Sequence, residues 1–221
     1  HQMSELKKRI LTSFLLLLII YFSFINSYVL YFLIFFVNFI SLDEFSKLFK
    51  RIFKNKKKII FVALILSTFY MVYFTLVIIY FLNGSFENNK YTLFFILLIC
   101  ISTDIGGYVF GKIIGGIKLT SISPKKTLSG LIGSFIFALI FGFVVHKLLY
   151  DLINLNLNLF LFIILTSFFS QIGDLFISYL KRMAKLKDTG SILPGHGGVL
   201  DRIDGILLAL PFSINLINIT S

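Results

Sequence analysis

The sequence predicts an all-α, polytopic integral membrane protein with about seven transmembrane helices, an eighth being left open. Hydrophobic residues make up 57% of the 221 residues and charged residues only 14%, which is roughly half the share in a typical soluble domain. Apolar runs of about 20 residues, the length that crosses a bilayer as a helix, recur along the chain. They cover residues 10–26, 28–42, 59–82, 91–111, 128–150, 157–180 and 199–219.

The second run is shorter than a perpendicular span, so a tilted or re-entrant segment is an alternative for residues 28–42. The segments between the runs are too short to form a soluble domain. His1 and Gln2 precede Met3, and we expect them to be a remnant of expression.

The net charge of +11 is distributed unevenly along the chain. Lysine and arginine gather before the first run and after the second, fourth and sixth runs, whereas the alternate loops hold only Lys90, with Lys147 close to one of them. This pattern predicts a cytosolic N-terminus and a C-terminus on the opposite side. The basic surplus suits anionic lipid headgroups, and we expect no nucleic-acid partner. The clustered cations are Lys7 to Arg9, Lys47, Lys50, Arg51, Lys54, Lys56 to Lys58, Lys112, Lys118, Lys125, Lys126, Lys181, Arg182, Lys185 and Lys187.

Acidic residues are concentrated beside the last apolar runs. Asp174 shares a helix face with Ser170, Ser178, Lys181 and Lys185, because these positions step by three or four residues. Asp201 and Asp204 share a face at the start of the last run. Carboxylates from two helix ends repel one another, and a hard cation such as Mg²⁺ relieves that repulsion. Intramembrane Asp–Lys pairing that only satisfies charge is the alternative.

The segment between these two runs is rich in glycine. Lys187 and Asp188 open it, and His196, Gly197 and Gly198 lead into the last run. Glycines allow close backbone approach to a ligand, and the N-terminal amides of the following helix attract anions. A phosphate-binding loop is therefore one interpretation and an ordinary interhelical turn is the other. His196 contacts phosphate in the first interpretation and only hydrogen-bonds the loop in the second.

A second polar patch lies upstream. Asp104 is near the end of the fourth run, and Ser123, Pro124, Lys125, Lys126 and Thr127 lead into the fifth. Two cations and two hydroxyls at a helix N-terminus favour binding of an anionic group.

Residues 178–204 fit the pattern S-x-L-K-R-x4-K-D-x-G-x2-L-P-x-H-G-G-V-x-D-R-I-D. This segment resembles the signature of the phosphatidate cytidylyltransferases, and both upstream segments of the second patch resemble motifs of the same family. The resemblance covers about residues 100–205, and the first 90 residues match only in hydropathy. Ser129 departs from the pattern, since an acidic residue is often expected there.

The resemblance implies condensation of CTP with phosphatidic acid to give CDP-diacylglycerol and pyrophosphate, with Mg²⁺ as cofactor and a second cation left open. It implies metal ligation by Asp174 and Asp201, supported by Asp204, and phosphate binding by Lys181, Arg182 and Arg202. The remaining substrate-binding candidates are Asp104, Ser123, Pro124, Lys125, Lys126, Thr127, Ser178, Lys187, Asp188, His196, Gly197 and Gly198.

The expected organisation follows from these motifs. Residues 1–90 form an N-terminal transmembrane region, and residues 91–221 form a catalytic transmembrane region whose site faces the cytosol. We expect a bacterial inner-membrane protein that binds membrane lipids. The oligomeric state is left open between a monomer and a homodimer.

Two other functions stay open. A CTP-dependent lipid or polyprenol kinase would use the same metal and nucleotide site but transfer the γ-phosphoryl group. An anion or lipid transporter is the non-enzymatic alternative, although the sequence shows no inverted repeat. The residues after Gly205 include no acid, which excludes the aspartate-rich motif of the CDP-alcohol phosphotransferases.

Overall fold

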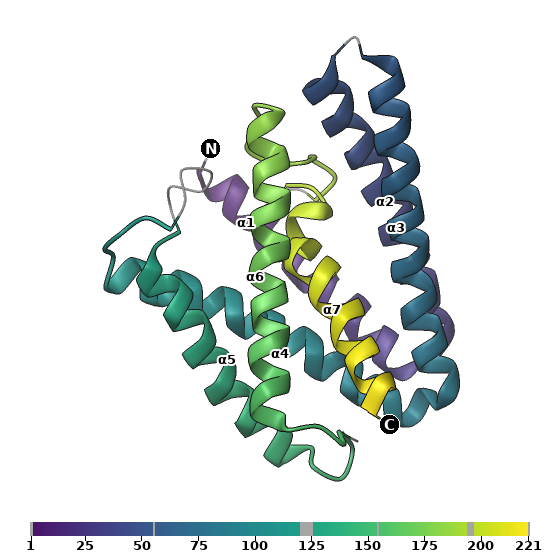
Figure 1. Cartoon of the computed structure of the whole chain (residues 1–221), viewed down its shortest axis with the longest axis vertical. Coiled ribbons are helices and arrows are strands. Elements are labelled where there is room, and N and C mark those ends of the chain that lie inside the picture. Colours follow the sequence, from purple (N-terminus) through teal and green to yellow (C-terminus); the bar gives the residue numbers. More distant parts are fainter. Residues whose placement is uncertain (1, 55, 120–125, 154, 194–196, 221) are drawn as a thin grey trace. The chain divides into compact units, whose positions relative to one another are not determined.

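The computed structural model describes residues 2–54, 56–119, 126–153, 155–193 and 197–220. Within these ranges the chain forms seven α-helices, and no strand is longer than an isolated β-bridge. The predicted all-α class is confirmed (Figure 1). The helices are α1 (Gln2–Ile25), α2 (Ser27–Phe53), α3 (Lys57–Gly84), α4 (Phe86–Ile113), α5 (Leu128–Leu148), α6 (Leu159–Met183) and α7 (Leu200–Thr220).

Six of these helices, α2 to α7, are long and apolar enough to cross a membrane, and α1 contains a shorter apolar stretch, Ile10–Ile25. Helix α2 is 27 residues long, so its short apolar run reflects a polar C-terminal half and not a short helix. Lys47, Lys50 and Arg51 therefore belong to this helix.

The surface and interior have the polarity expected of a protein in lipid. Phe61, Phe69 and Tyr80 on α3 are 65, 71 and 75% exposed. Thr103, Ser167 and Ser213, in contrast, are fully buried. Buried hydroxyls pair between helices, as Thr103 does when it donates to Ser167 Oγ at 2.9 Å. Small polar residues at helix contacts and large apolar residues on the outside are typical of membrane helix bundles.

The chain divides into two compact units. The first combines residues 1–79 with 180–203, and the second combines residues 80–179 with 204–221. The boundaries of these units differ from the expected division at residue 90. That division separated a catalytic region from a non-catalytic one, and it stays a prediction.

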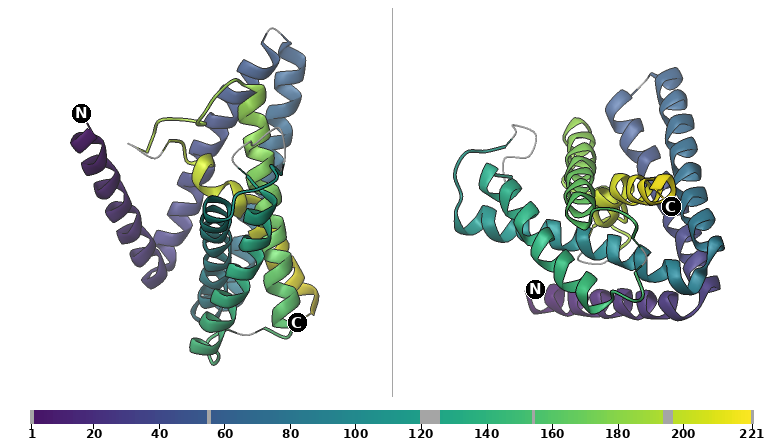
Figure 2. Two further views of the ribbon diagram at one scale, coloured as in Figure 1. Left: turned by 90° about the vertical axis from the view of Figure 1, so that its left-hand side faces the viewer. Right: turned by 60° about the horizontal axis from the view of Figure 1, so that its bottom comes forward.

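In the first unit, α1 and α2 diverge from a sharp turn at Asn26 (Figure 2). The Asn26 side chain caps α2 by accepting a hydrogen bond from Tyr28 N. Helices α2 and α3 run antiparallel, and a buried hydrogen bond joins Asn38 Nδ2 to Thr75 Oγ1.

In the second unit, close helix contacts depend on glycine. A Cβ at Gly133 of α5 would lie 2.2 Å from the Phe110 side chain of α4. A Cβ at Gly173 of α6 would lie 2.4 Å from the carbonyl oxygen of Asp204 on α7. Neither contact leaves room for a larger residue, so both helix pairs pack with their backbones close together.

Candidate active site

The predicted site residues fall into two groups, one in each compact unit. Ser123, Pro124, Lys125 and His196 lie outside the described residues, and their roles stay predictions. The first unit holds Lys181, Arg182, Lys187, Asp188, Gly197, Gly198, Asp201 and Arg202. The second unit holds Asp104, Lys126, Thr127, Asp174, Ser178 and Asp204.

Helix α6 ends just after the first basic pair of the signature. Leu186 N donates to Lys181 O at 2.8 Å and Lys185 N donates to Arg182 O at 3.0 Å, which is the Schellman pattern of a helix C-terminus. Lys185 has φ of 56° and occupies the left-handed position where glycine is usual. The prediction that Lys185 extends the polar face of this helix is therefore wrong, because the chain has already turned away.

Asp201, in the first turn of α7, accepts hydrogen bonds from four donors. Lys181 Nζ lies 2.7 Å from Oδ1. Thr189 N and Gly198 N donate to Oδ2 at 2.8 and 2.9 Å, and Thr189 Oγ1 lies 3.0 Å from the same atom. The side chains of Asp201 and Lys181 are only 7 and 12% exposed. Asp201 thus ties the end of α6 and the signature loop to the start of α7.

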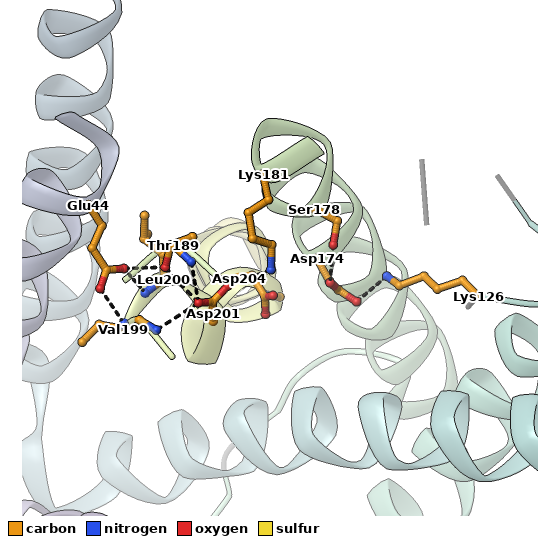
Figure 3. A network of polar contacts seen from close by, with 12 residues as sticks. Glu44, Lys126, Asp174, Ser178, Lys181, Thr189, Val199, Leu200, Asp201 and Asp204 are labelled. Atoms are coloured by element: carbon orange, nitrogen blue, oxygen red, sulfur yellow. Dashed lines mark hydrogen bonds and ion pairs between the residues drawn. The ribbon is translucent and has the colours of Figure 1, made fainter. Parts of the chain in front are cut away.

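Glu44 of α2 holds the other side of the same loop. Its carboxylate accepts from Val199 N on Oε1 and from Leu200 N on Oε2, both at 2.9 Å, and from Thr189 Oγ1 at 2.7 Å. Figure 3 shows Glu44 pointing from its helix toward these three groups. The residue is 0% exposed, so it is part of the interior of this unit.

Four charged signature residues of the first unit lie on its surface. Arg182, Lys187, Asp188 and Arg202 are exposed. Gly197 has φ of +84°, and its carbonyl oxygen accepts from Leu193 N at 3.0 Å. The loop therefore combines a fixed inner side with charged groups that are accessible to a ligand.

A cavity of about 300 Å³ lies among α4, α5 and α6 in the second unit. Lys126 forms an ion pair with Asp174 Oδ2 there, and Ser178 donates to Oδ1 at 3.3 Å (Figure 3). The two paired side chains are 27 and 25% exposed. The cavity is lined by Thr103, Asp104, Gly107, Tyr108, Leu119, Lys126, Thr127, Gly130, Leu131, Ser134, Gln171, Asp174 and Ser178. The structure thus brings five of the predicted residues together around one opening.

The segment before α5 is held at its base by backbone pairing. Leu119 N donates to Lys126 O at 2.8 Å and Leu128 N donates to Ile117 O at 2.9 Å. Thr127 caps α5, since its hydroxyl accepts from Gly130 N at 3.1 Å. Ser129 donates to Gly115 O at 2.5 Å. Ser129 therefore connects the two ends of this segment, which gives a structural role to the one position that departs from the family pattern.

Asp204 lies where α7 packs on α6. Its Oδ1 accepts from Gly205 N at 2.9 Å, and its carbonyl oxygen faces Gly173. A Cβ at Gly205 would lie 2.5 Å from Ser170 Oγ. The backbone around Asp204 is therefore fixed by this helix contact.

The described residues contain no group of three or more His, Cys, Asp or Glu side chains arranged to hold a metal ion. Asp174 and Asp204 belong to the second unit and Asp201 to the first. A metal site that uses these three carboxylates stays a prediction.

Comparison with known proteins supplies the family. The sequence profile described as the cytidylyltransferase family matches residues 2–220. The chain belongs to the cytidylyltransferase family.

Among curated relatives, three phosphatidate cytidylyltransferases illustrate the similarity. The Staphylococcus epidermidis RP62A protein is 39% identical over 136 residues, which is 60% of this chain and 50% of the relative. The Bacillus subtilis 168 protein is 42% identical over 128 residues, 56% of this chain and 47% of the relative. The Staphylococcus aureus COL protein is 41% identical over 139 residues, 61% of this chain and 51% of the relative. The chain spans about half the length of the curated relatives it matches.

Sequence reasoning missed Glu44 in this cytidylyltransferase family member. Glu44 follows Asp43 in a polar stretch with Lys47, and Asp43 and Lys47 form an exposed pair at 2.5 Å. The only available signal was its spacing from Asn38 and Ser41, since positions 38, 41 and 44 share one face of a helix. All three residues are buried.

Proposed function

We propose that this chain catalyses the transfer of a cytidylyl group from CTP to phosphatidic acid. An unesterified phosphate oxygen of the lipid attacks the α-phosphorus of CTP, and a new P–O bond forms. The bond from that phosphorus to the oxygen bridging to the β-phosphate breaks, and pyrophosphate leaves with the electron pair. The products are CDP-diacylglycerol and pyrophosphate.

The observation that carries this proposal is the cavity around Lys126 and Asp174. It combines a cation and two carboxylates with hydroxyl groups from Thr127, Ser134 and Ser178. Such a set offers a positive group for phosphate and oxygen ligands for a hard cation. The family assignment and the names of the relatives support the choice of a cytidylyl transfer among reactions that use these groups.

The residues suit a reaction in which charge repulsion is the main barrier. The phosphate of phosphatidic acid is already anionic near neutral pH, so no protein base is needed to create the nucleophile. Lysine and arginine side chains neutralise charge that develops on the transferred and leaving groups. Lys126 and Lys181, with the exposed Arg182 and Arg202, are the proposed phosphate ligands.

Mg²⁺ is the proposed cofactor, with Asp174 and Asp201 as ligands and Asp204 in support. The donor set fits a hard cation, because carboxylate and hydroxyl groups present only oxygen atoms. Asp174 is the better placed of the two ligands, since its Oδ1 accepts only a long hydrogen bond from Ser178 among the described residues. When bound, Mg²⁺ supplies positive charge that offsets the repulsion between the two anionic substrates.

The proposal is tested with the purified chain in detergent, CTP, Mg²⁺ and phosphatidic acid, followed by mass analysis of the lipids. We expect CDP-diacylglycerol and an equal amount of pyrophosphate, lost with EDTA and restored by Mg²⁺. A phosphorylated lipid together with CDP would instead identify a CTP-dependent kinase. Passage of anions or lipids through proteoliposomes without consumption of CTP would identify a transporter.

The site is proposed to open to the cytosol of a bacterial cell, where CTP is available. Lys187 and Asn88 are both exposed and provide reporters for the two predicted sides. In a Cys100→Ser background, we expect an impermeant maleimide to label Lys187→Cys only after spheroplasts are lysed. Asn88→Cys should be labelled in intact spheroplasts. Labelling of position 187 from outside would contradict both the topology and the nucleotide site.

A further inference from the structure

Glu44 is a buried acid that neither the signature nor the proposed reaction explains. It is 0% exposed, and no lysine or arginine among the described residues forms an ion pair with it. Burying a carboxylate is costly unless hydrogen bonds satisfy it. Here the donors are two backbone amides and one hydroxyl, all contributed by the signature loop and the start of α7.

The two amides explain how the buried charge is tolerated. Val199 N and Leu200 N lie at the start of α7, where backbone N–H groups have no partner within the helix. The positive end of the helix dipole also favours a negative group at this position. Glu44 therefore caps α7 from a different helix, α2. Glu44 and Val199 are 155 residues apart in the sequence.

Two glycines of the signature leave room for this carboxylate. A Cβ at Gly190 would lie 2.5 Å from Glu44 Oε1. A Cβ at Gly198 would lie 2.5 Å from the same atom and 2.1 Å from Thr189 Oγ1. The glycines at 190 and 198 thus accommodate Glu44, which is a role distinct from phosphate binding.

Thr189 connects Glu44 to the aspartate proposed to act in catalysis. Its hydroxyl has a single proton, which is shared between Glu44 Oε2 at 2.7 Å and Asp201 Oδ2 at 3.0 Å. Its backbone N–H donates to Asp201 Oδ2 at 2.8 Å. The opposite oxygen of Asp201 accepts from Lys181. A continuous series of hydrogen bonds therefore runs from α2 through the loop to the end of α6.

We propose that Glu44 is a positioning residue that sets the orientation of Asp201 and Lys181 through Thr189 and the start of α7. This inference rests on the proposed function, because the effect on catalysis is expected only if those two side chains act in the reaction. Glu44 itself touches no substrate, since it is fully buried. Glu44 thereby places part of the catalytic machinery in the first 90 residues, which lie within the match to the family profile at residues 2–220 but outside the signature segments.

The test compares Glu44→Gln with Asp43→Asn. Glutamine keeps the size of the side chain but turns an NH₂ group toward one of the two amides, so one hydrogen bond is replaced by a donor–donor contact. We expect kcat to fall about 10- to 100-fold while KM for CTP and phosphatidic acid changes by less than about threefold. Asp43 is the adjacent exposed acid and makes only a surface pair with Lys47, so Asp43→Asn should keep wild-type kcat.

A second variant and a second readout separate positioning from a loss of fold. Thr189→Val removes the shared hydroxyl, and we expect its effect on kcat to be largely absent in a Glu44→Gln background. Hydrogen–deuterium exchange of the peptide that contains Val199 and Leu200 should be faster in Glu44→Gln than in the wild type. Unfolding is followed with a thiol-reactive fluorophore, because Cys100 is the only cysteine and is buried.

The outcomes distinguish this inference from the proposed function. Wild-type kcat in Glu44→Gln would overturn the inference, as would full additivity of the two substitutions. A wild-type chain that makes no CDP-diacylglycerol contradicts the proposed function. In that case hydrogen–deuterium exchange still tests whether Glu44 holds the start of α7, and an unchanged rate at Val199 and Leu200 in Glu44→Gln would overturn that claim. If Glu44→Gln does not fold, Thr189→Val alone decides, with the same expected decrease in kcat and unchanged KM.

Discussion

Two aspartate–lysine pairs of this cytidylyltransferase family member share the same chemistry but differ in their surroundings. The Asp201–Lys181 pair is 7 and 12% exposed, whereas the Asp174–Lys126 pair is 25 and 27% exposed and lines a cavity. Asp201 accepts from two amides and a hydroxyl in addition to its lysine. Asp174 accepts only a 3.3 Å hydrogen bond from Ser178 beyond its ion pair, among the described residues.

The difference distinguishes two aspartates to which the family resemblance assigned the same role, ligation of a metal ion. A carboxylate has about four lone-pair positions. In Asp201 all three described donors on Oδ2 belong to the loop that precedes α7, so this carboxylate is held in one orientation. Asp174 keeps acceptor capacity toward an open cavity. We therefore expect Asp174 to exchange ligands during the reaction and Asp201 to keep its loop contacts throughout.

The largest expected effect comes from the open pair. Asp174→Asn removes the charge that the proposed metal site requires, and we expect a loss of more than about a thousandfold in kcat. The fold should be retained, because a partly exposed side chain contributes little to stability. Cytidylyl transfer from CTP measures the first quantity, and the thiol-reactive fluorophore at Cys100 measures the second. Retention of a tenth of wild-type activity would rule out Asp174 as a ligand.

The buried pair should respond in the opposite way. Lys181→Met leaves the Asp201 carboxylate buried without its cation. We therefore expect the free energy of unfolding to fall by about 3 kcal/mol. The matched substitution Lys126→Met should cost less than about 1 kcal/mol, because that pair is partly solvated. Thermal unfolding of the two variants in the same detergent compares them directly. Equal losses of stability would mean that the two pairs do not differ as their exposures indicate.

Much of the fold could be predicted from the sequence because the bilayer fixes the length of apolar runs. The seven predicted runs correspond to α1 to α7, and the start of α5 at Leu128 coincides with the predicted one. The polar half of α2 could not be predicted in this way, since Asp43, Glu44 and Lys47 have the composition of a solvated loop.

The site was predictable where neighbours in sequence are neighbours in space. Thr127 caps the helix that it precedes, and Asp174 and Ser178 lie one turn apart on α6, as their spacing indicates. Glu44 was not predictable, because its partner Thr189 lies 145 residues away and only packing brings them together. The prediction that Lys185 lies on α6 was also wrong. Lys185 ends the helix in a left-handed conformation, and the sequence did not signal this end because the residue usual at such a position is glycine.

The central claim is that Asp174 offers an open carboxylate to a metal ion. It is tested most directly by Mn²⁺ binding, measured by electron paramagnetic resonance on the purified chain with CTP present. The account predicts that Asp174→Asn weakens Mn²⁺ binding at least about tenfold, whereas Asp43→Asn binds as the wild type does. An Asp174→Asn variant that binds Mn²⁺ as tightly as the wild type would contradict it.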